Sequence, residues 1–433
     1  MRIVTLTRES IEDIMSGLLR RNPGQYGEYE DVVRNIIHDV RQNGDQTVFE
    51  LTKKFDKWDV NKDNVRVTEE EINAAFDSYD KELIAVMERS AANIRNYHEK
   101  QLQNSWIDVK DDGTILGQKI TPIDTVGVYV PGGKAAYPSS TLMCIIPALV
   151  AGVKRIVMLT PAGADGKVAD CTLVAAKITG VDEIYKVGGA QAVAAMAFGT
   201  QSIPKVDKIV GPGNIFVALA KKEVFGFVSI DSVAGPSEIL VIADETANPE
   251  YVAADLLSQA EHDELASAIL VTDSMTLAEN VSQHVDKFTE ALERSEIIRK
   301  SLDNYGYILV AKNMDEAVET ANRIASEHVE IITKDPFDIM TKVDHAGAIF
   351  IGEYSSEPLG DYYAGPNHVL PTNGTARFFS PLGVDAFIKR TSIINYSKAA
   401  LENACDDIMK FATAEGLTAH ANSIGVRFQK GVL

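Results

Sequence analysis

The sequence predicts an α/β protein with two doubly wound, incomplete Rossmann-like domains, mostly parallel sheets, N-terminal helices and a small C-terminal helical tail. Short β-branched runs alternate with helical stretches, which is typical of βαβ units. Glycine-rich turns close several of the strands, and the tail has a different, more polar pattern. At roughly 150 residues per domain, a chain of 433 residues suggests about three structural units.

Residues 1 to about 104 are predicted to be helical. Between Glu69 and Gln103 apolar residues recur at steps of three and four, which predicts one long amphipathic helix. We expect these helices to have a structural role and no catalytic one. We also expect them to complete the outer layer of the second α/β unit, described below.

The pattern strand, glycine turn, helix occurs four times between residues 125 and 237 and predicts a domain with a parallel sheet. A second α/β pattern follows, with strands expected at 239–243, 267–272, 307–310 and 348–351 and helices at 249–260, 277–295 and 314–325. The tail carries a strand-like piece, Ser392 to Asn395, and an amphipathic helix, Lys398 to Ala414. It is too short for a core of its own, so it must dock on the body or on a second subunit.

These patterns, with the resemblance described below, predict four parts of the chain. Residues 1–27 form an N-terminal helical segment, and residues 28–124 together with 238–381 form an α/β domain that carries metal and catalytic residues. Residues 125–237 form a nucleotide-binding α/β domain, and residues 382–433 form a docking tail.

The charge balance of the chain is strongly acidic. There are 42 Lys and Arg against 62 Asp and Glu, a net charge of −20, which disfavours nucleic-acid binding. Three widely spaced cysteines provide neither a zinc knuckle nor a disulfide framework, which favours a reducing compartment. With no secretory signal and no apolar run long enough for a bilayer, a cytoplasmic protein without membrane contact is expected.

Three glycine turns follow predicted strands: Pro131-Gly132-Gly133, Gly188-Gly189 and Gly211-Pro212-Gly213. In a parallel sheet they meet at the carboxyl edge, where bare backbone N–H groups can approach a nucleotide. The alternative is that glycine serves only the turn geometry, and no GxGxxG fingerprint is present. The side chains beside the turns that could contact a ribose or nicotinamide are Tyr129, Gln191 and Asn214.

Two further segments carry groups suited to metal binding or proton transfer. In LSQAEHDE, Gln259 and His262 lie three apart on a predicted helix and project from one face, a pair suited to zinc or manganese. A lone histidine is more often structural, so further ligands must come from elsewhere. In ASEHVEI, Glu327 and His328 lie near an expected helix end. They could act as a general acid and a general base, or they could simply lie at a solvent-exposed helix end.

The remaining candidates lie in a loop and in the tail. PLGDYYAGPNHVLP presents Asp361 and His368 as equal ligand candidates. AEGLTAHANS carries Glu415 and His420, which could complete a site on another subunit.

Together the motifs are specific, and they resemble the histidinol dehydrogenase family over essentially the whole chain. They are GVYVPGG, YPSS, VGGAQA, GPGN, IDSVAGPSEILVIAD, LLSQAEHD, SEHVEI, GDYYAGPNHVLPT and AEGLTAHANS. The resemblance implies the last steps of histidine biosynthesis, in which L-histidinol is oxidised to L-histidinal and then to L-histidine while two NAD are reduced. It also implies one zinc per site and a homodimer with an exchanged C-terminal tail.

The family's functional residues all have counterparts in this sequence. The resemblance implies Glu327 and His328 as the catalytic pair and Tyr129, Gln191 and Asn214 as cofactor contacts. It implies zinc ligands at Gln259, His262, Asp361 and, from the partner chain, His420, so it prefers His420 over His368. Substrate contacts are implied at Ser237, Gln259, His262, His328, Asp361, Glu415 and His420.

The chemistry of two oxidations is consistent with these residues. His328 can take the hydroxyl proton, and Glu327 can take a proton from the water that hydrates the aldehyde. A thiolate route is disfavoured because the cysteines sit in apolar helices outside the motifs. Two alternatives are a related zinc- and NAD-dependent dehydrogenase of another small alcohol and a catalytically silent nucleotide-binding scaffold.

Overall fold

The computed structural model of the chain describes residues 1–19, 21, 27–132 and 136–430. The described chain divides into two units: unit 1 comprises residues 1–101 and 123–387, and unit 2 comprises residues 102–122 and the segment from 388 onward. Unit 1 contains two parallel sheets and unit 2 a small antiparallel one, which confirms the predicted α/β class.

The larger sheet of unit 1 has six parallel strands in the order β1-β11-β10-β9-β12-β13. Their bounds are Arg2–Thr5, Gly306–Val310, Ser267–Thr272, Glu238–Ala243, His328–Ile332 and Ala348–Ile351. The runs EILVIA and SAILVT are buried at every position, as expected for parallel strands covered on both faces.

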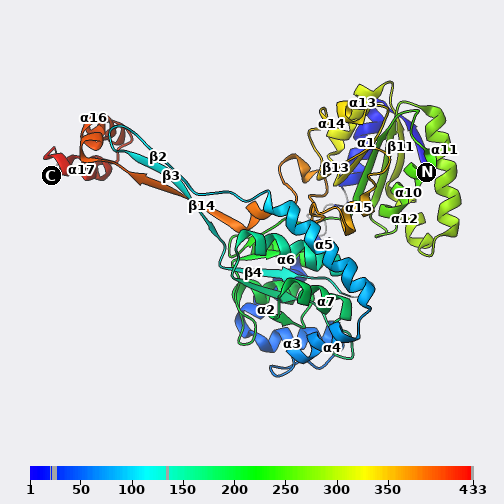
Figure 1. The fold of residues 1–433 in the computed structure, drawn as a ribbon, viewed down its shortest axis with the longest axis horizontal. Coiled ribbons are helices and arrows are strands. Elements are labelled where there is room, and N and C mark those ends of the chain that lie inside the picture. The colour runs from blue at the N-terminus through cyan, green and yellow to red at the C-terminus, as the bar shows by residue number, and fades with distance from the viewer. Residues whose placement is uncertain (20, 22–26, 133–135, 431–433) are drawn as a thin grey trace. The chain divides into compact units, whose positions relative to one another are not determined.

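Helices cover both faces of this sheet (Figure 1). One layer consists of α10, α11 and α12, spanning Pro249–Ala260, Met275–Ala291 and Ser295–Tyr305. The opposite layer consists of α1, α13 and α14, spanning Arg8–Leu19, Met314–Ile324 and Pro336–Met340. Each layer buries its own apolar cluster, so the sheet is a rigid support for groups at its edges.

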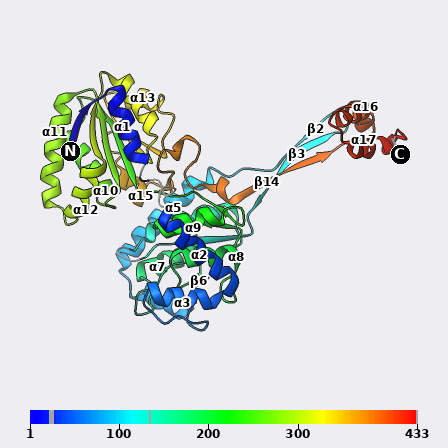
Figure 2. The ribbon, with the colours of Figure 1, turned by 180° about the vertical axis from the view of Figure 1, so that it is seen from behind.

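The second sheet of unit 1 has five parallel strands in the order β6-β5-β4-β7-β8. Their bounds are Ile184–Tyr185, Arg155–Leu159, Thr125–Tyr129, Lys208–Val210 and Ser229–Ile230. One face packs against α2, α3, α8 and α9 (Figure 2), spanning Gly27–Asn43, Asp45–Phe55, Gly189–Phe198 and Ile215–Val224. The other packs against α4, α6 and α7, with α5 outside them, spanning Glu69–Ser78, Pro138–Ala151, Asp170–Thr179 and Lys81–Glu99.

The N-terminal helices are placed differently from the expectation. Strand β1 and helix α1 join the six-stranded sheet, whereas α2 to α5 bury their apolar faces on the five-stranded half. Only polar contacts link α5 to the 238–381 segment among the bonds described: Ser90 and Asn93 donate to the carbonyl oxygens of Tyr362 and Tyr363. The reason is that apolar periodicity predicts a buried face but not the surface that buries it. The expected single helix from Glu69 to Gln103 is two helices, because Asp80 caps the second through the N–H groups of Glu82 and Leu83.

Unit 2 joins the tail to an earlier segment of the chain. Its sheet has the antiparallel order β14-β3-β2, with bounds Ile388–Asn395, Ile115–Pro122 and Trp106–Val109. Two helices follow, α16 over Lys398–Ala414, with the predicted bounds, and α17 over Thr418–Gly425. Within the described residues, no helix is both long and apolar enough to cross a membrane.

Candidate active site and metal centre

The glycine turns of the five-stranded sheet meet at its carboxyl edge, as the sequence predicts. They follow β4, β6 and β7, which run parallel. The backbone N–H of Gly189 donates to the Tyr129 hydroxyl oxygen at 3.1 Å, and Gly211 stands directly against the Tyr129 backbone. Gly133 of the first turn lies outside the described residues.

Gly211 is held by a buried ion pair behind the turn. Its N–H donates to Asp231 Oδ2 at 2.8 Å, and its carbonyl oxygen accepts from Lys221 Nζ at 2.8 Å. Lys221 and Asp231 also pair with each other. The φ of Gly211 is +117°, and a Cβ there would lie 2.1 Å from the Tyr129 carbonyl oxygen. The turn therefore has room only for glycine at this position.

Gly211→Ala is expected to destabilise the fold by about 2–4 kcal/mol, the sum of an unfavourable φ and overpacking, and to weaken NAD binding. Gly180→Ala is the matched control, because Gly180 also has positive φ, +81°, but open space around a Cβ. Thermal unfolding and NAD titration of both variants measure the difference. Equal losses in the two variants would contradict the role given to the Tyr129 contact.

The three residues predicted beside these turns have different environments. Tyr129 is buried, and burial raises the pKa of its hydroxyl to about 12. Gln191 is buried in α8. Asn214 is exposed and caps α9, its Oδ1 accepting from the N–H groups of Phe216 and Val217 at 3.1 and 3.2 Å. Tyr129 thus contacts the glycines of two turns, whereas Asn214 is exposed beside the third turn.

Glu327 and His328 lie at the amino edge of the six-stranded sheet. The sequence predicted a helix end here, but α13 ends at Ile324 and His328 is the first residue of β12. The solvated-end interpretation is also wrong, since Glu327 is 7% and His328 4% exposed. A short apolar run after a helix gives little signal to separate a strand from a continued helix.

The pair is oriented by Glu238, the first residue of β9. Glu327 Oε2 accepts from the Glu238 N–H at 3.0 Å, and Glu238 Oε2 accepts from the Glu327 N–H at 3.3 Å. His328 Nδ1 lies 2.9 Å from the Glu238 carbonyl oxygen, so Nδ1 carries the proton and Nε2 is left as the basic nitrogen. Buried Arg21 pairs with Glu238 and balances its charge.

Burial changes the proton affinity of both side chains. It raises the pKa of Glu327 well above its usual range, and the nearby Glu238 carboxylate adds to the rise. Burial lowers the pKa of His328 to about 4, against smaller opposite effects of Asp361 and Glu238. The imidazole is therefore neutral near pH 7, and the Glu327 carboxyl holds its proton more tightly than an exposed carboxyl does.

The predicted metal donors lie beside this pair. Gln259 occupies the last turn of α10, and its Nε2 is 3.2 Å from His328 Nδ1, a contact without a hydrogen bond because both nitrogens carry protons. His262 lies beyond the helix, which ends at Ala260, so the two residues do not share a helix face as expected. Gln259 is 1% exposed, and within the described chain its Oε1 has no hydrogen-bond partner. A buried, unpaired carbonyl oxygen fits a metal ligand.

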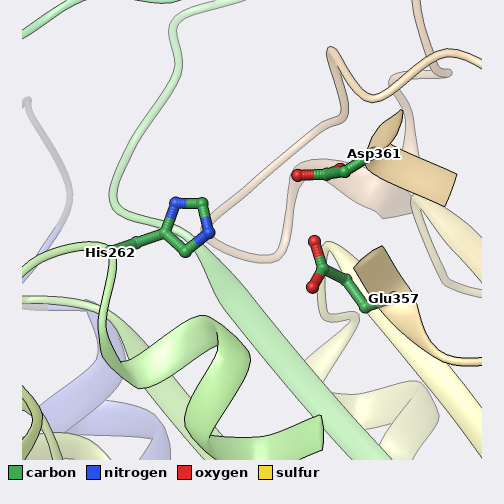
Figure 3. A group of neighbouring side chains, drawn as sticks. All are labelled: His262, Glu357 and Asp361. Atoms are coloured by element: carbon green, nitrogen blue, oxygen red, sulfur yellow. The ribbon is translucent and has the colours of Figure 1, made fainter. Parts of the chain in front are cut away.

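Asp361 belongs to a short helix, α15, over Glu357–Tyr362. Figure 3 shows His262, Glu357 and Asp361 pointing toward one another, and their ligand atoms all lie within 4.8 Å. Imidazole nitrogen with carboxylate and amide oxygens is a donor set suited to zinc. The residues present therefore fit a zinc ion.

His368 supports Asp361 from the side. Its Nδ1 is 3.6 Å from Asp361 Oδ1, and its Nε2 is 3.2 Å from Ser140 Oγ. Burial alone would raise the pKa of Asp361, but the contact with His368 lowers it to about 2. Asp361 and His368, which the sequence presents on one segment, are therefore in contact in the structure.

Ser237, Glu415 and His420 complete the predicted set. Ser237 is half-buried just before β9, in unit 1. Glu415 and His420 are exposed and belong to unit 2, at the end of α16 and in α17.

Three site residues were not predicted from the sequence: Arg21, Glu238 and Glu357. Glu357 had a usable signal, since it lies four residues before Asp361 and so shares a helix face with it. Glu238 lies inside the specific motif IDSVAGPSEILVIAD. Arg21 had no local signal, because its ion pair with Glu238 joins residues that are far apart in the chain.

Comparison with known proteins gives a consistent result. Residues 19–428 match the family model of histidinol dehydrogenase. The histidinol dehydrogenase of Bacillus subtilis is 58% identical over 92% of this chain and 93% of its own length. That of Geobacillus kaustophilus is 55% identical over 97% and 99%. The crystal structure of histidinol dehydrogenase from Elizabethkingia anophelis has a TM-score of 0.93 and 36% identity, covering 99% of this chain and 98% of that one.

Proposed function

The chain belongs to the histidinol dehydrogenase family, and from this premise we propose that it oxidises L-histidinol to L-histidinal and then to L-histidine in one site, with two NAD reduced. As a family member it is a zinc- and NAD-dependent oxidoreductase of histidine biosynthesis. One observation carries the proposal: the metal donor Gln259 lies 3.2 Å from His328 of the buried acid–base pair.

The substrate would be held at the donor cluster. We assign the zinc to Gln259, His262, Asp361 and the partner subunit's His420. These residues would hold the zinc, which would supply a binding site for the imidazole and amine of the substrate, since imidazole is a favoured zinc ligand. Ser237, Glu415 and His420 would contact the rest of the molecule, and His328 would face its hydroxyl.

The first oxidation needs a base for the hydroxyl proton. His328 fills this role through Nε2, because its Nδ1–H is engaged by the Glu238 carbonyl oxygen. Tyr129, Gln191 and Asn214 would hold NAD at the turns, where it would supply the acceptor for the hydride that leaves carbon.

The second oxidation needs a water molecule added to the aldehyde. Glu327 in its ionised form takes the proton of that water. Keeping both steps in one buried site prevents escape of the aldehyde. Burial raises the pKa of the Cys144 thiol, which speaks against a thiolate route through that residue.

We also propose a homodimer with an exchanged C-terminal tail, in the cytoplasm and without nucleic-acid or membrane partners. Unit 2 exposes large apolar side chains on its sheet and helices, among them Trp106, Ile107, Val109, Ile394 and Phe411. Such exposure favours an interface with another chain. The tail residues Glu415 and His420 would enter the partner's site.

The test is the yield of NADH per L-histidinol, before and after removal of the metal by a chelator. Two NADH per substrate are expected, lost on chelation and restored by zinc. One NADH per substrate would refute the second step and Glu327's role in it. No NADH from a folded, zinc-loaded sample would indicate a different alcohol substrate.

A further inference from the structure

We propose that Glu357 is a metal ligand of the single subunit: with Gln259, His262 and Asp361 it holds the zinc while the partner's His420 is absent, and it yields to His420 when the tail docks. The inference rests on the proposed function, because it presumes the zinc site and the exchanged tail. It adds a ligand and a loading state that the family resemblance does not include.

The first argument is geometric. Glu357 and Asp361 are four residues apart on α15, so both carboxylates face the same side, and His262 approaches them from beyond α10 (Figure 3). Their ligand atoms lie within 4.8 Å of one another. Donors bonded to one zinc at about 2.0–2.2 Å are about 3–3.5 Å apart in a tetrahedron, so only a small contraction is needed.

The second argument is the unused oxygen of Glu357. The residue is 2% exposed. Its Oε2 accepts from Ser258 Oγ at 3.1 Å, and its N–H donates to Glu330 Oε1 at 2.7 Å, so the backbone and one oxygen are fixed. The other oxygen, Oε1, has no hydrogen-bond partner of regular geometry within the described chain, and the carboxyl interacts on that side with the carboxylate of Asp361. Buried carboxylates are normally paired or bound to a metal, so Oε1 is the expected donor atom.

The third argument is the completeness of the set. Gln259 Oε1 is another buried oxygen without a hydrogen-bond partner within the described chain. With His262 and Asp361, the subunit then has four donors, the number that closes a tetrahedral zinc site. Two carboxylates also balance the charge of a divalent ion in a buried place. A newly folded subunit can therefore bind zinc before it meets its partner.

The experiment compares zinc affinity in full-length variants by competition with a chromophoric chelator, together with zinc content per chain. His420→Asn is expected to retain one zinc per chain. Adding Glu357→Gln should weaken binding by more than about 100-fold, beyond the usual cost of losing an outer-shell partner. Glu357→Gln alone, with His420 present, should keep its zinc.

The matched control is Glu330→Gln in the His420→Asn background. Glu330 is as buried as Glu357 and also has an unpartnered oxygen, but it is not among the converging donors. The amide oxygen of glutamine can still accept from the Glu357 N–H, so the backbone of Glu357 stays fixed in this variant. It should bind zinc like His420→Asn alone. An equal loss from Glu330→Gln would overturn the proposal, because the effect would then be general electrostatics. Unchanged binding after Glu357→Gln would overturn it directly.

A second variant tests the proposal if Glu357→Gln does not fold. Glu357→His in the His420→Asn background should bind cobalt with a visible absorption band shifted by the added nitrogen ligand. An unshifted band would contradict ligation at residue 357. A wild-type protein that binds no zinc at all would refute the proposed function itself, whereas intact wild-type binding with an insensitive Glu357 refutes only this inference.

Discussion

Glu327→Gln is expected to slow the oxidation of L-histidinal by about 10²- to 10⁴-fold, the usual contribution of a positioned general base. The glutamine can still accept the Glu238 N–H bond, so the strand edge should remain in place. The amide cannot take a proton from water, and hydration of the aldehyde should fail. His328 is unchanged, so the first oxidation should be less affected.

The measurement separates the two steps in single turnovers, starting once from L-histidinol and once from L-histidinal. NADH per L-histidinol should fall from two toward one, and L-histidinal should accumulate. Glu330→Gln is the matched control, since Glu330 is a buried carboxylate on the same strand, β12. It should leave the ratio of the two rates unchanged. An equal loss in both steps of Glu327→Gln would contradict its assignment to the hydration step.

The bounds of elements with strong periodicity or clear end signals could be predicted from the sequence. The helix Lys398–Ala414 and the strands Ser267–Thr272 and Ala348–Ile351 have the predicted bounds. Buried β-branched runs between glycine turns and helices leave few alternatives. Strand β12 was missed, because HVEII follows a helix closely and is short.

The site was harder to predict than the fold. The residue types were found individually, but their neighbours depend on the strand order β10-β9-β12-β13, which local spacing does not contain. That order brings Glu238 beside Glu327 and His328 although they are far apart in the chain. The general rule also pointed to the carboxyl edge, whereas this pair lies at the amino edge of its sheet. Only the resemblance to the family singled out His420.

Mixing two inactive variants is expected to restore activity if the tail is exchanged. One subunit carries His420→Asn, and the other carries Glu327→Gln with His328→Asn. In a heterodimer, one site combines an intact body with an intact tail, and the other site has neither. Random mixing makes half of the dimers mixed, so about a quarter of wild-type activity should return.

The alternative predicts a different number. If His420 completed the site of its own chain, each site in every dimer would carry a defect, and the mixture would stay inactive. Two affinity tags allow the heterodimer to be purified, and its activity should then approach half that of the wild-type dimer, because one of its two sites is intact. The zinc content of the His420→Asn parent matters as a control. If that parent keeps its zinc through Glu357 and is still inactive, the recovered activity reports the tail's contact with substrate and not a mere return of metal.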